Sequence, residues 1–338
     1  MLEVRQRDIT IDALKTVAIV LVVLNHVNEN INISHGIEAN VIQMIARTGV
    51  PIFLFATGYL LIDRDFFNLK YVQRFYSVNF INIFLSATFW TVVMSILMFA
   101  INIDVHVLLK NIFWQTKVLP QFWYIQALVI PYFLLPLFGY LRNVPKVLWL
   151  FQSVGVFVLS FQELTKAFVS ESFSPFSVIF HGSMDTTIMM LVFMLFGYFV
   201  KQGLNRFQCI SLVCSALLFN GVFILVYQLR GQDFAFYSQW YTSPWTMFNG
   251  LVFVLLLFRL MKKIKFSEFW KNFFVKISSL SYGIYILHYF VLIILKRYFL
   301  MNENLLSFVA LLIGTFAISA TLAGLMKKVK FLPKFVLL

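Results

Sequence analysis

The sequence has 338 residues, of which 61% are hydrophobic and only 12% are charged, and its formal net charge is +13. Soluble domains usually contain about 25% charged residues, so this composition excludes an ordinary soluble protein. A nucleic-acid-binding protein is also excluded, because the basic residues stand between long apolar runs and not on one soluble face. The apolar runs are continuous over roughly 16–25 residues, which predicts membrane-spanning helices, whereas barrel strands would alternate apolar and polar residues.

In chain order, these runs predict about ten spanning helices. The predicted spans are 13–28, 38–62, 76–101, 121–140, 147–161, 185–200, 207–229, 243–261, 277–296 and 304–326. The connections and both tails are short, so no soluble domain of ordinary size remains outside the spans. We therefore expect residues 1–338 to form one all-α integral-membrane domain, a polytopic helix bundle surrounded by lipid.

The positive charges indicate an orientation for this bundle. Lys and Arg residues gather in the N-terminal flank, in every second connection and in the C-terminal tail, and the opposite connections hold far fewer. Because positive residues are retained on the cytoplasmic side, we expect both termini to be cytoplasmic. Termini on the same side require an even number of spans.

The eighth connection contains an aromatic stripe. Residues at helical spacing carry aromatic rings, with Lys and Glu on the other faces of the same segment, and these are Phe266, Phe269, Trp270, Phe273 and Phe274. The pattern predicts an amphipathic helix lying in the cytoplasmic interface. A plain membrane anchor is its favoured role.

The first span carries two ionisable side chains on one face. Lys15 precedes His26 by eleven positions, which places the two on the same side of a helix and about 16 Å apart along its axis. Imidazole suits proton transfer near neutral pH, so His26 is a candidate general base. The alternative is a snorkelling Lys and a His that caps the outer end of the span.

Arg47 is the second candidate functional residue, because placing an ionisable group inside a bilayer costs free energy. It lies four residues before Pro51, which frees backbone carbonyls and favours a kink in the helix. Arg47 could stabilise a developing oxyanion or bind polar groups of a substrate. Equally, it could form an ion pair with Glu38 or Asp185.

The ninth span also carries a polar face. Ser281, Tyr285 and His288 lie at i, i+4 and i+7, so they share one side of the helix and point to a bundle interior or an aqueous cavity. His288 could assist acceptor binding, but a structural hydrogen-bonding role is favoured. The remaining histidines share no short spacing, so no metal site is expected from His35, His106 and His181.

Aromatic residues also gather in the predicted outer connection between the seventh and eighth spans. They are Phe234, Phe236, Tyr237, Trp240, Tyr241 and Trp245. Aromatic faces suit sugar rings, but an interfacial aromatic belt predicts the same residues. We favour the belt.

Four segments, taken together, resemble a known family. They are Asp12-Ala-Leu-Lys15 running into the apolar stretch that ends at His26, the segment from Gly49 to Leu61, the segment from Phe122 to Leu128 followed by Tyr132, and Leu280-Ser281-Tyr282-Gly283-Ile284-Tyr285-Ile286-Leu287-His288. In this order, and spread over nearly the whole chain, they are similar to the motifs of acyltransferase family 3. Members of that family are integral-membrane O-acyltransferases that modify glycans.

The resemblance implies a function and a set of roles. It implies an enzyme of the bacterial inner membrane that moves an acyl group, acetyl in the simplest case, from cytoplasmic acyl-CoA to a hydroxyl of an extracytoplasmic or lipid-linked glycan. Acyl-CoA is then a co-substrate, with no bound cofactor and no nucleic-acid partner. His26 is the catalytic base, and Lys15, Lys70 and Arg74 bind the donor phosphates. Residues expected to support the substrate or transition state are Arg47, Asp12, Trp123, Tyr124, Ser281, Tyr285 and His288.

The sequence departs from the family pattern at two positions, Ser77 and Gln121. Family members often have two Arg residues three apart at the start of the third helix, where this chain has Arg74 and Ser77. The His that usually precedes the Trp motif is Gln121. Both departures bear on donor binding more than on His26.

Two other function classes remain open from the sequence. One is a secondary transporter or exporter of a polar solute or polysaccharide intermediate, although we find no inverted repeats or matched broken helices. The other is a noncatalytic membrane partner of a polysaccharide assembly machine. Acyl transfer by the purified protein would distinguish the enzyme from both.

Overall fold

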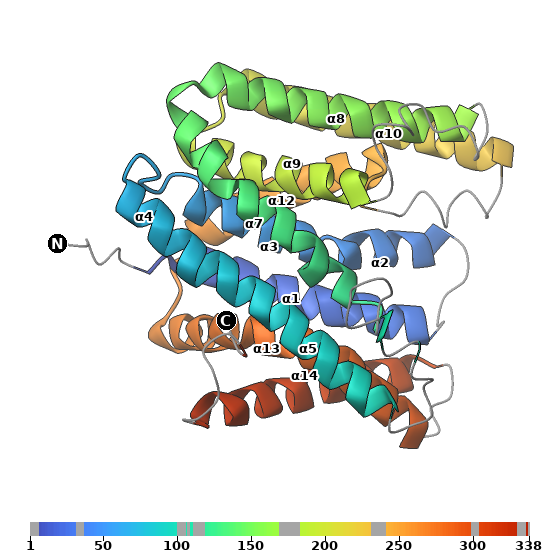
Figure 1. The fold of residues 1–338 in the computed structure, drawn as a ribbon. Coiled ribbons are helices and arrows are strands. Elements are labelled where there is room, and N and C mark those ends of the chain that lie inside the picture. Colours follow the sequence, from blue (N-terminus) through green and yellow to red (C-terminus); the bar gives the residue numbers. More distant parts are fainter. Residues whose placement is uncertain are drawn as a thin grey trace.

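The protein is described from a computed structural model, which covers residues 7–31, 37–99, 106, 109–110, 119–168, 183–230, 241–298, 304–329 and 336. This part of the chain is an all-helical bundle without strands (Figure 1). Its longer helices are α1 (Ile9–Asn30), α2 (Ile37–Arg47), α3 (Gly49–Leu61), α5 (Ile81–Phe99), α7 (Phe122–Tyr140), α8 (Pro145–Phe168), α9 (Ser183–Gln202), α10 (Arg206–Arg230), α12 (Pro244–Lys263), α13 (Glu268–Tyr298) and α14 (Leu305–Lys328). Short elements are α4 (Leu69–Arg74), the π-helix η1 (Phe75–Phe80) and the 3-10 helix η2 (Leu141–Asn143).

Ten helical stretches in the described residues are long and apolar enough to cross a membrane, which confirms the predicted spans. Three of these stretches contain more than one element, because α4, η1 and α5 run on from one another, α3 continues the end of α2, and η2 continues α7. Some runs end at charged residues, such as Lys262 and Lys263 in the last turn of α12. The protein is therefore a multi-pass membrane protein.

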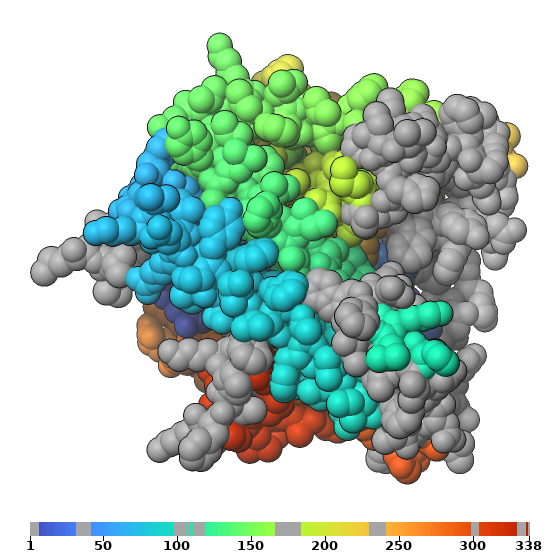
Figure 2. All heavy atoms as spheres, in the orientation of Figure 1, coloured from blue at the N-terminus to red at the C-terminus, as the bar shows by residue number. Residues whose placement is uncertain are grey.

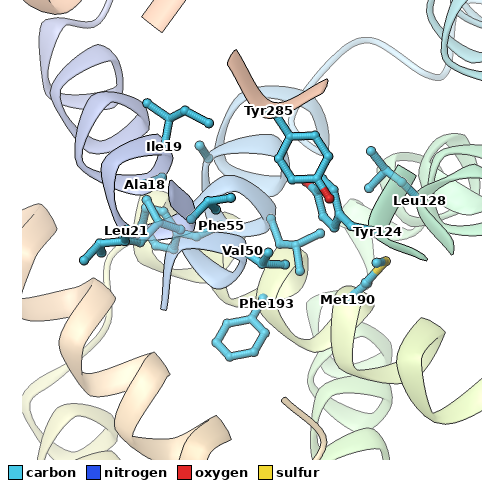
Figure 3. Packing of buried hydrophobic residues seen from close by; sticks show 14 of the residues in the cluster. Ala18, Ile19, Leu21, Val50, Phe55, Tyr124, Leu128, Met190, Phe193 and Tyr285 are labelled. Carbon is cyan, nitrogen blue, oxygen red and sulfur yellow. The ribbon is translucent and has the colours of Figure 1, made fainter. Parts of the chain in front are cut away.

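The centre of the bundle is formed by α1, α3, α9 and α13. α1 packs against α3 and α13, and α3 packs against α9. Apolar side chains of α1, α3, α7 and α9 fill this centre, with Tyr285 of α13 beside them (Figure 3). α10 and α14 lie at opposite edges (Figure 1), with only 11% and 22% of their spanning residues buried, so their outer faces are the ones that meet lipid. On the face seen in Figure 2, α4 and α5 run across the molecule between α8 and α14.

The contact between α3 and α9 depends on two glycines. A Cβ atom at Gly58 would collide with the backbone carbonyl of Met194, and one at Gly197 would collide with the carbonyl of Phe55. Small residues allow helix backbones to approach closely inside a membrane, where packing and not water drives association. The two glycines therefore fix how closely α3 and α9 lie.

The second predicted span is broken at Thr48, between α2 and α3. Pro51 has no N–H to donate to the carbonyl of Arg47, four residues earlier, so the regular hydrogen-bond ladder cannot continue there. The Thr48 hydroxyl donates to the carbonyl of Ile45 at 2.6 Å and closes the last turn of α2. Arg47, the last residue of α2, is held at this break with only 7% of its surface exposed.

The separate interfacial helix expected around residues 266–274 is not present, and this expectation is wrong. From Glu268 onward these residues form the first turns of α13, which continues without interruption through the ninth span. No proline stands between residues 268 and 298, so nothing in the backbone ends the helix early. The aromatic stripe still faces outward, with Phe269 71% exposed.

Candidate active site

His26 lies near the end of α1 and is held by a carboxylate one turn further on. Its Nδ1 is 2.9 Å from Oε2 of Glu29. The other oxygen of Glu29 accepts hydrogen bonds from Asn25 Nδ2 at 3.0 Å and Gln43 Nε2 at 3.2 Å. Because a carboxylate with several donors around it acts as an acceptor, Nδ1 of His26 donates to it, and in the neutral imidazole the lone pair then lies on Nε2.

Helix α2 supports this carboxylate from the side. Gln43 donates from Nε2 to Asn25 Oδ1 at 2.9 Å, and its own Oε1 accepts from Asn28 Nδ2 at 2.6 Å. Arg47 reaches the same carboxylate, with Nη2 3.7 Å from Oε1 of Glu29. Arg47 is buried while the Glu29 side chain is 36% exposed. The pair therefore joins the bundle interior to an open face.

Two rings of α13 contact the His26 imidazole. The centroid of the His288 ring is 5.2 Å away, and that of the Tyr289 ring is 5.1 Å away in a T-shaped arrangement. His288 has no exposed surface, and its Nδ1 is 2.7 Å from the carbonyl oxygen of Tyr285. His26 itself is only 8% exposed, so its imidazole faces α13 and not the lipid.

A cavity of about 350 Å³ is lined by residues of α1, α3, η1, α5, α7 and α13, and we call it the central cavity. Its wall includes Lys15, Thr57, Asn79, Asn82, Tyr124, Tyr132, Ser278, Ser281, Tyr282 and Tyr285. The rings of Tyr124 and Tyr285 lie side by side with centroids 5.3 Å apart (Figure 3). The Tyr285 ring is also 5.7 Å from that of His288. Through Tyr285 the central cavity therefore adjoins the two imidazoles.

A second cavity, of about 790 Å³, lies at the Lys15 end of α1, and we call it the basic cavity. The charged side chains around it are mainly cationic, namely Arg7, Lys15, Arg64, Lys201 and Lys327, with the acidic Asp8 and Asp12. Arg7 donates to both carboxylate oxygens of Asp12, at 2.6 and 2.9 Å, and these bonds raise the pKa of the Arg7 guanidinium. A wide opening with surplus positive charge suits a polyanion.

Lys15 and Ser278 line both cavities, so the two cavities are neighbours. Lys15 lines the basic cavity together with Asp12 and the central cavity together with Tyr285. A track of polar groups therefore begins at the basic cavity and passes Lys15 and the central cavity. It then reaches Tyr285, His288 and His26, whose rings are neighbours. The shared face of α1 that the sequence predicted for Lys15 and His26 forms one side of this track.

The other predicted site residues fall into three places. Trp123 packs against Tyr241, with ring centroids 5.3 Å apart, and burial raises the pKa of the Tyr241 hydroxyl. Tyr124 and Ser281 line the central cavity, where Ser281 Oγ donates to its own helix at the carbonyl of Ser278, 2.8 Å away. Lys70 and Arg74 are exposed on α4 and are not among the residues that line either cavity.

Several predictions fall on residues that the structure does not describe. His35, His181 and residues 231–240, which include four of the six predicted belt aromatics, lie outside the described ranges. The same holds for the side chain of Glu38, one proposed partner of Arg47. Asp185, the other proposed partner, accepts a hydrogen bond from Gln162 Nε2 at 2.9 Å. Among the described residues, no group of three or more His, Cys, Asp or Glu could hold a metal ion.

The comparison with protein families shows which family the chain belongs to. The model of acyltransferase family 3, described as an acyltransferase domain, matches residues 8–324, nearly the whole chain. The chain belongs to acyltransferase family 3. No curated protein and no solved structure matches it. With the ten spanning helices, the family makes this protein a membrane acyltransferase.

The four family-like segments meet in the bundle although they are far apart in the sequence. They lie on α1, α3, α7 and α13, and each of these helices contributes a residue to the wall of the central cavity, such as Lys15, Thr57, Tyr124 and Tyr285. Because the helices surround one cavity, the acyltransferase motifs form a single site.

Of the two departures from the family pattern, Gln121 lies nearer to His288. It is fully buried, its backbone carbonyl accepts a hydrogen bond from the Tyr285 hydroxyl, and its Nε2 donates to the carbonyl of Ile286 at 3.4 Å. Ser77 is exposed within η1 and donates to the carbonyl of Arg74 at 3.3 Å. Gln121 thus connects α7 to the polar face of α13, whereas Ser77 interacts within its own helix.

Sequence reasoning missed the acidic partner of His26 in this acyltransferase. The first span was predicted to end at residue 28, but α1 continues to Asn30 and so includes Glu29. A signal was present, because Glu29 follows His26 by three positions, which is contact distance on a helix. Gln43 could not be found in this way, since its contact with Asn25 joins two helices.

Proposed function

We propose that this protein is an O-acyltransferase of the bacterial inner membrane. It would transfer an acyl group, acetyl in the simplest case, from cytoplasmic acyl-CoA to a hydroxyl of an extracytoplasmic or lipid-linked glycan. The observation that carries the proposal is the track from the basic cavity through Lys15 to a His26 whose Nδ1 is held by Glu29. One helix then faces the donor at one end and the acceptor at the other.

The basic cavity is the proposed site of the donor's phosphates. Coenzyme A carries several phosphate charges, and Arg and Lys side chains bind phosphate through charge-assisted hydrogen bonds. The pantetheine arm is long and has polar amides, which match the hydroxyl and amide side chains around the central cavity, including Asn79, Asn82 and Ser278. Lys15 lines both cavities and would contact the donor there.

His26 is the proposed general base. Glu29 accepts from Nδ1–H, which leaves Nε2 able to take the proton of an acceptor hydroxyl as its oxygen attacks the thioester carbonyl. The carboxylate orients the ring and stabilises the imidazolium, as the acid does in hydrolase triads. Arg47 lies 3.7 Å from Glu29, and its positive charge favours the ionised carboxylate.

The acceptor is proposed to approach from the Glu29 side. The Glu29 side chain is 36% exposed. Trp123 and Tyr241 form an aromatic pair. Besides burial, the charges of Arg47 and Glu29 act on the pKa of the Tyr241 hydroxyl, so this pair lies near them. Aromatic faces pack well against sugar rings, and Arg47 provides a polar partner. A glycan hydroxyl could thus reach His26 while the acyl donor stays on the opposite side.

The test is acyl transfer in cells. Surface glycans from cells with and without this chain are compared by mass spectrometry, and the acyl group should be present only when the chain is present. His26→Ala should abolish the modification while the protein remains in the membrane at normal abundance. Isolated membranes given radiolabelled acetyl-CoA should label the glycan in the same pattern.

Two results would contradict the proposal. If glycans from cells with the His26→Ala protein are acylated as in wild type, His26 has no part in the mechanism. Movement of a glycan or other solute across proteoliposomes without any use of acyl-CoA would identify a transporter. His106→Gln, a change at an exposed histidine of the described chain, is the control for loss of an imidazole elsewhere.

A further inference from the structure

His288 is a buried imidazole for which the general-base mechanism has no use. Its Nδ1 is 2.7 Å from the carbonyl oxygen of Tyr285 and 3.2 Å from that of Ile284. Carbonyl oxygens only accept hydrogen bonds, so Nδ1 carries the proton and Nε2 holds a lone pair. Within the described part of the chain, this Nε2 is buried without a hydrogen-bond partner.

A buried polar atom without a hydrogen-bond partner costs free energy, and such an atom often has a functional role. His288 is also the ring that contacts both sides of the reaction track. Its centroid is 5.2 Å from that of His26 and 5.7 Å from that of Tyr285, which lines the central cavity. Its ring therefore adjoins the base on one side and the cavity proposed for the donor arm on the other.

We propose that His288 is the general acid that protonates the leaving sulfur of the acyl-CoA donor. This inference rests on the proposed function. The acceptor oxygen bonds to the acyl carbon and its proton passes to Nε2 of His26, while the carbon–sulfur bond breaks. As that bond breaks, the proton passes from His26 to Nε2 of His288 and from this nitrogen to the departing sulfur. The products are an O-ester and a free thiol, and both imidazoles end neutral.

The environment explains why such an acid is useful. A thiolate formed inside the bundle would be an isolated charge in a medium of low dielectric constant, which is costly. Protonation at the moment of departure removes that charge. When His288 carries the extra proton, its Nδ1–H remains bonded to the carbonyl of Tyr285, and that charge-assisted bond stabilises the imidazolium. The titratable groups that face the ring are His26, Tyr285 and Tyr289.

The experiment compares two donors in native membranes that contain the glycan acceptor. One donor is acetyl-CoA, and the other is the acetyl thioester of 4-nitrothiophenol, whose thiolate leaves without needing a proton. His288→Gln keeps a side-chain donor for the helix carbonyl but cannot carry a proton. We expect its rate to fall about 100-fold with acetyl-CoA and to stay close to wild type with the activated thioester. His26→Ala should be inactive with both donors.

The outcomes separate this inference from the proposed function. If wild-type membranes transfer acetyl from neither donor, the proposed function fails. If wild type is active but His288→Gln is equally impaired with both donors, or unimpaired with acetyl-CoA, only the role of His288 is overturned. His288→Asn is compared in the same way, so that a folding defect of one variant cannot decide the result. His106→Gln is the matched control.

Discussion

The two ends of α1 have opposite characters. At the Lys15 end, α1 borders the wide basic cavity of about 790 Å³, whose lining includes five cationic side chains and two acidic ones. At the His26 end, Glu29 is hydrogen-bonded to Asn25 and His26 within α1, and Gln43 of α2 donates to Asn25 and Glu29, at distances of 2.9 to 3.2 Å. The same helix therefore borders a wide basic cavity at one end and a hydrogen-bonded contact with α2 at the other.

The difference between the two ends of α1 matches the role proposed for each, which is donor binding at the Lys15 end and proton transfer at the His26 end. Attraction of a polyanion depends on net charge over a wide area and tolerates movement of individual side chains. Proton transfer to an attacking oxygen depends on geometry at the level of an ångström. We therefore expect changes at the His26 end to lower kcat, and changes at the Lys15 end to raise KM for the acyl donor.

The largest effect is expected for Glu29→Gln. The amide keeps the shape of the side chain but removes the charge that fixes the His26 tautomer and stabilises the imidazolium. By analogy with loss of the orienting acid in a catalytic triad, kcat should fall about 10²- to 10⁴-fold. KM for acetyl-CoA should change little, because Glu29 lies at the end of α1 away from the basic cavity. Steady-state kinetics in membranes measure both values.

The control for this change is Glu268→Gln, at an exposed carboxylate that pairs with Lys271 at 2.6 Å. It removes the same charge from the surface and should leave both constants unaltered. A Glu29→Gln protein with normal kcat would show that the carboxylate has no part in orienting His26. An increase in KM without loss of kcat would place Glu29 in substrate binding instead.

The middle of α1 offers a change that should affect both ends together. A Cβ at Gly49 would lie 2.7 Å from the backbone oxygen of Ala18, so Gly49→Ala must push α3 away from α1. Overpacking of this kind costs about 1–3 kcal/mol in the free energy of unfolding. Thermal or denaturant unfolding in detergent measures the loss. Both kcat and KM should worsen, because α3 and α1 line the central cavity together.

Gly221→Ala is the matched control, since a Cβ at that position of α10 meets nothing within 4 Å. Alanine favours a helix over glycine, so stability should be unchanged or slightly greater. If Gly49→Ala proved as stable as Gly221→Ala, the close contact between α1 and α3 would not limit the fold.

The sequence predicted the features that depend on one helix at a time. Long apolar runs identify the ten spans, and helical periodicity places Lys15 and His26 on one face. The break beside Arg47 follows from the missing N–H of Pro51. These features could be found because each one depends on local spacing or on the solvent that surrounds a segment.

Features that depend on contacts between helices could not be predicted in this way. The basic cavity brings together Arg64, Lys201 and Lys327 from distant parts of the chain. The ion pair between Arg47 and Glu29 joins α2 to α1, whereas sequence reasoning named Glu38 and Asp185 as partners. In the bundle Glu29 approaches Arg47 because Gln43, one turn earlier on α2, is hydrogen-bonded to Asn25 and Asn28 of α1.

A smaller effect is expected for Lys15→Met, which keeps the length of the side chain and removes its charge. Loss of one charge-assisted hydrogen bond to the donor, about 1.5 kcal/mol, corresponds to roughly a tenfold increase in KM for acetyl-CoA. The value of kcat should change less than for Glu29→Gln. Lys265→Met, at an exposed lysine that lines neither cavity, is the control. A normal KM in Lys15→Met would remove Lys15 from the donor site.

The smallest effect is expected for Lys70→Gln and Arg74→Gln, and it tests where the donor phosphates bind. Both residues are exposed on α4, so their attraction for a polyanion is screened by salt and contributes less than about 1 kcal/mol. We expect KM for acetyl-CoA to rise less than about threefold and the difference to vanish at high ionic strength. Arg64→Gln and Lys201→Gln, within the basic cavity, should raise KM further and keep most of that effect in salt. A larger increase in KM for Lys70→Gln and Arg74→Gln than for Arg64→Gln and Lys201→Gln would contradict this placement. It would indicate that the donor phosphates bind at the surface of α4, as the resemblance to the family implied.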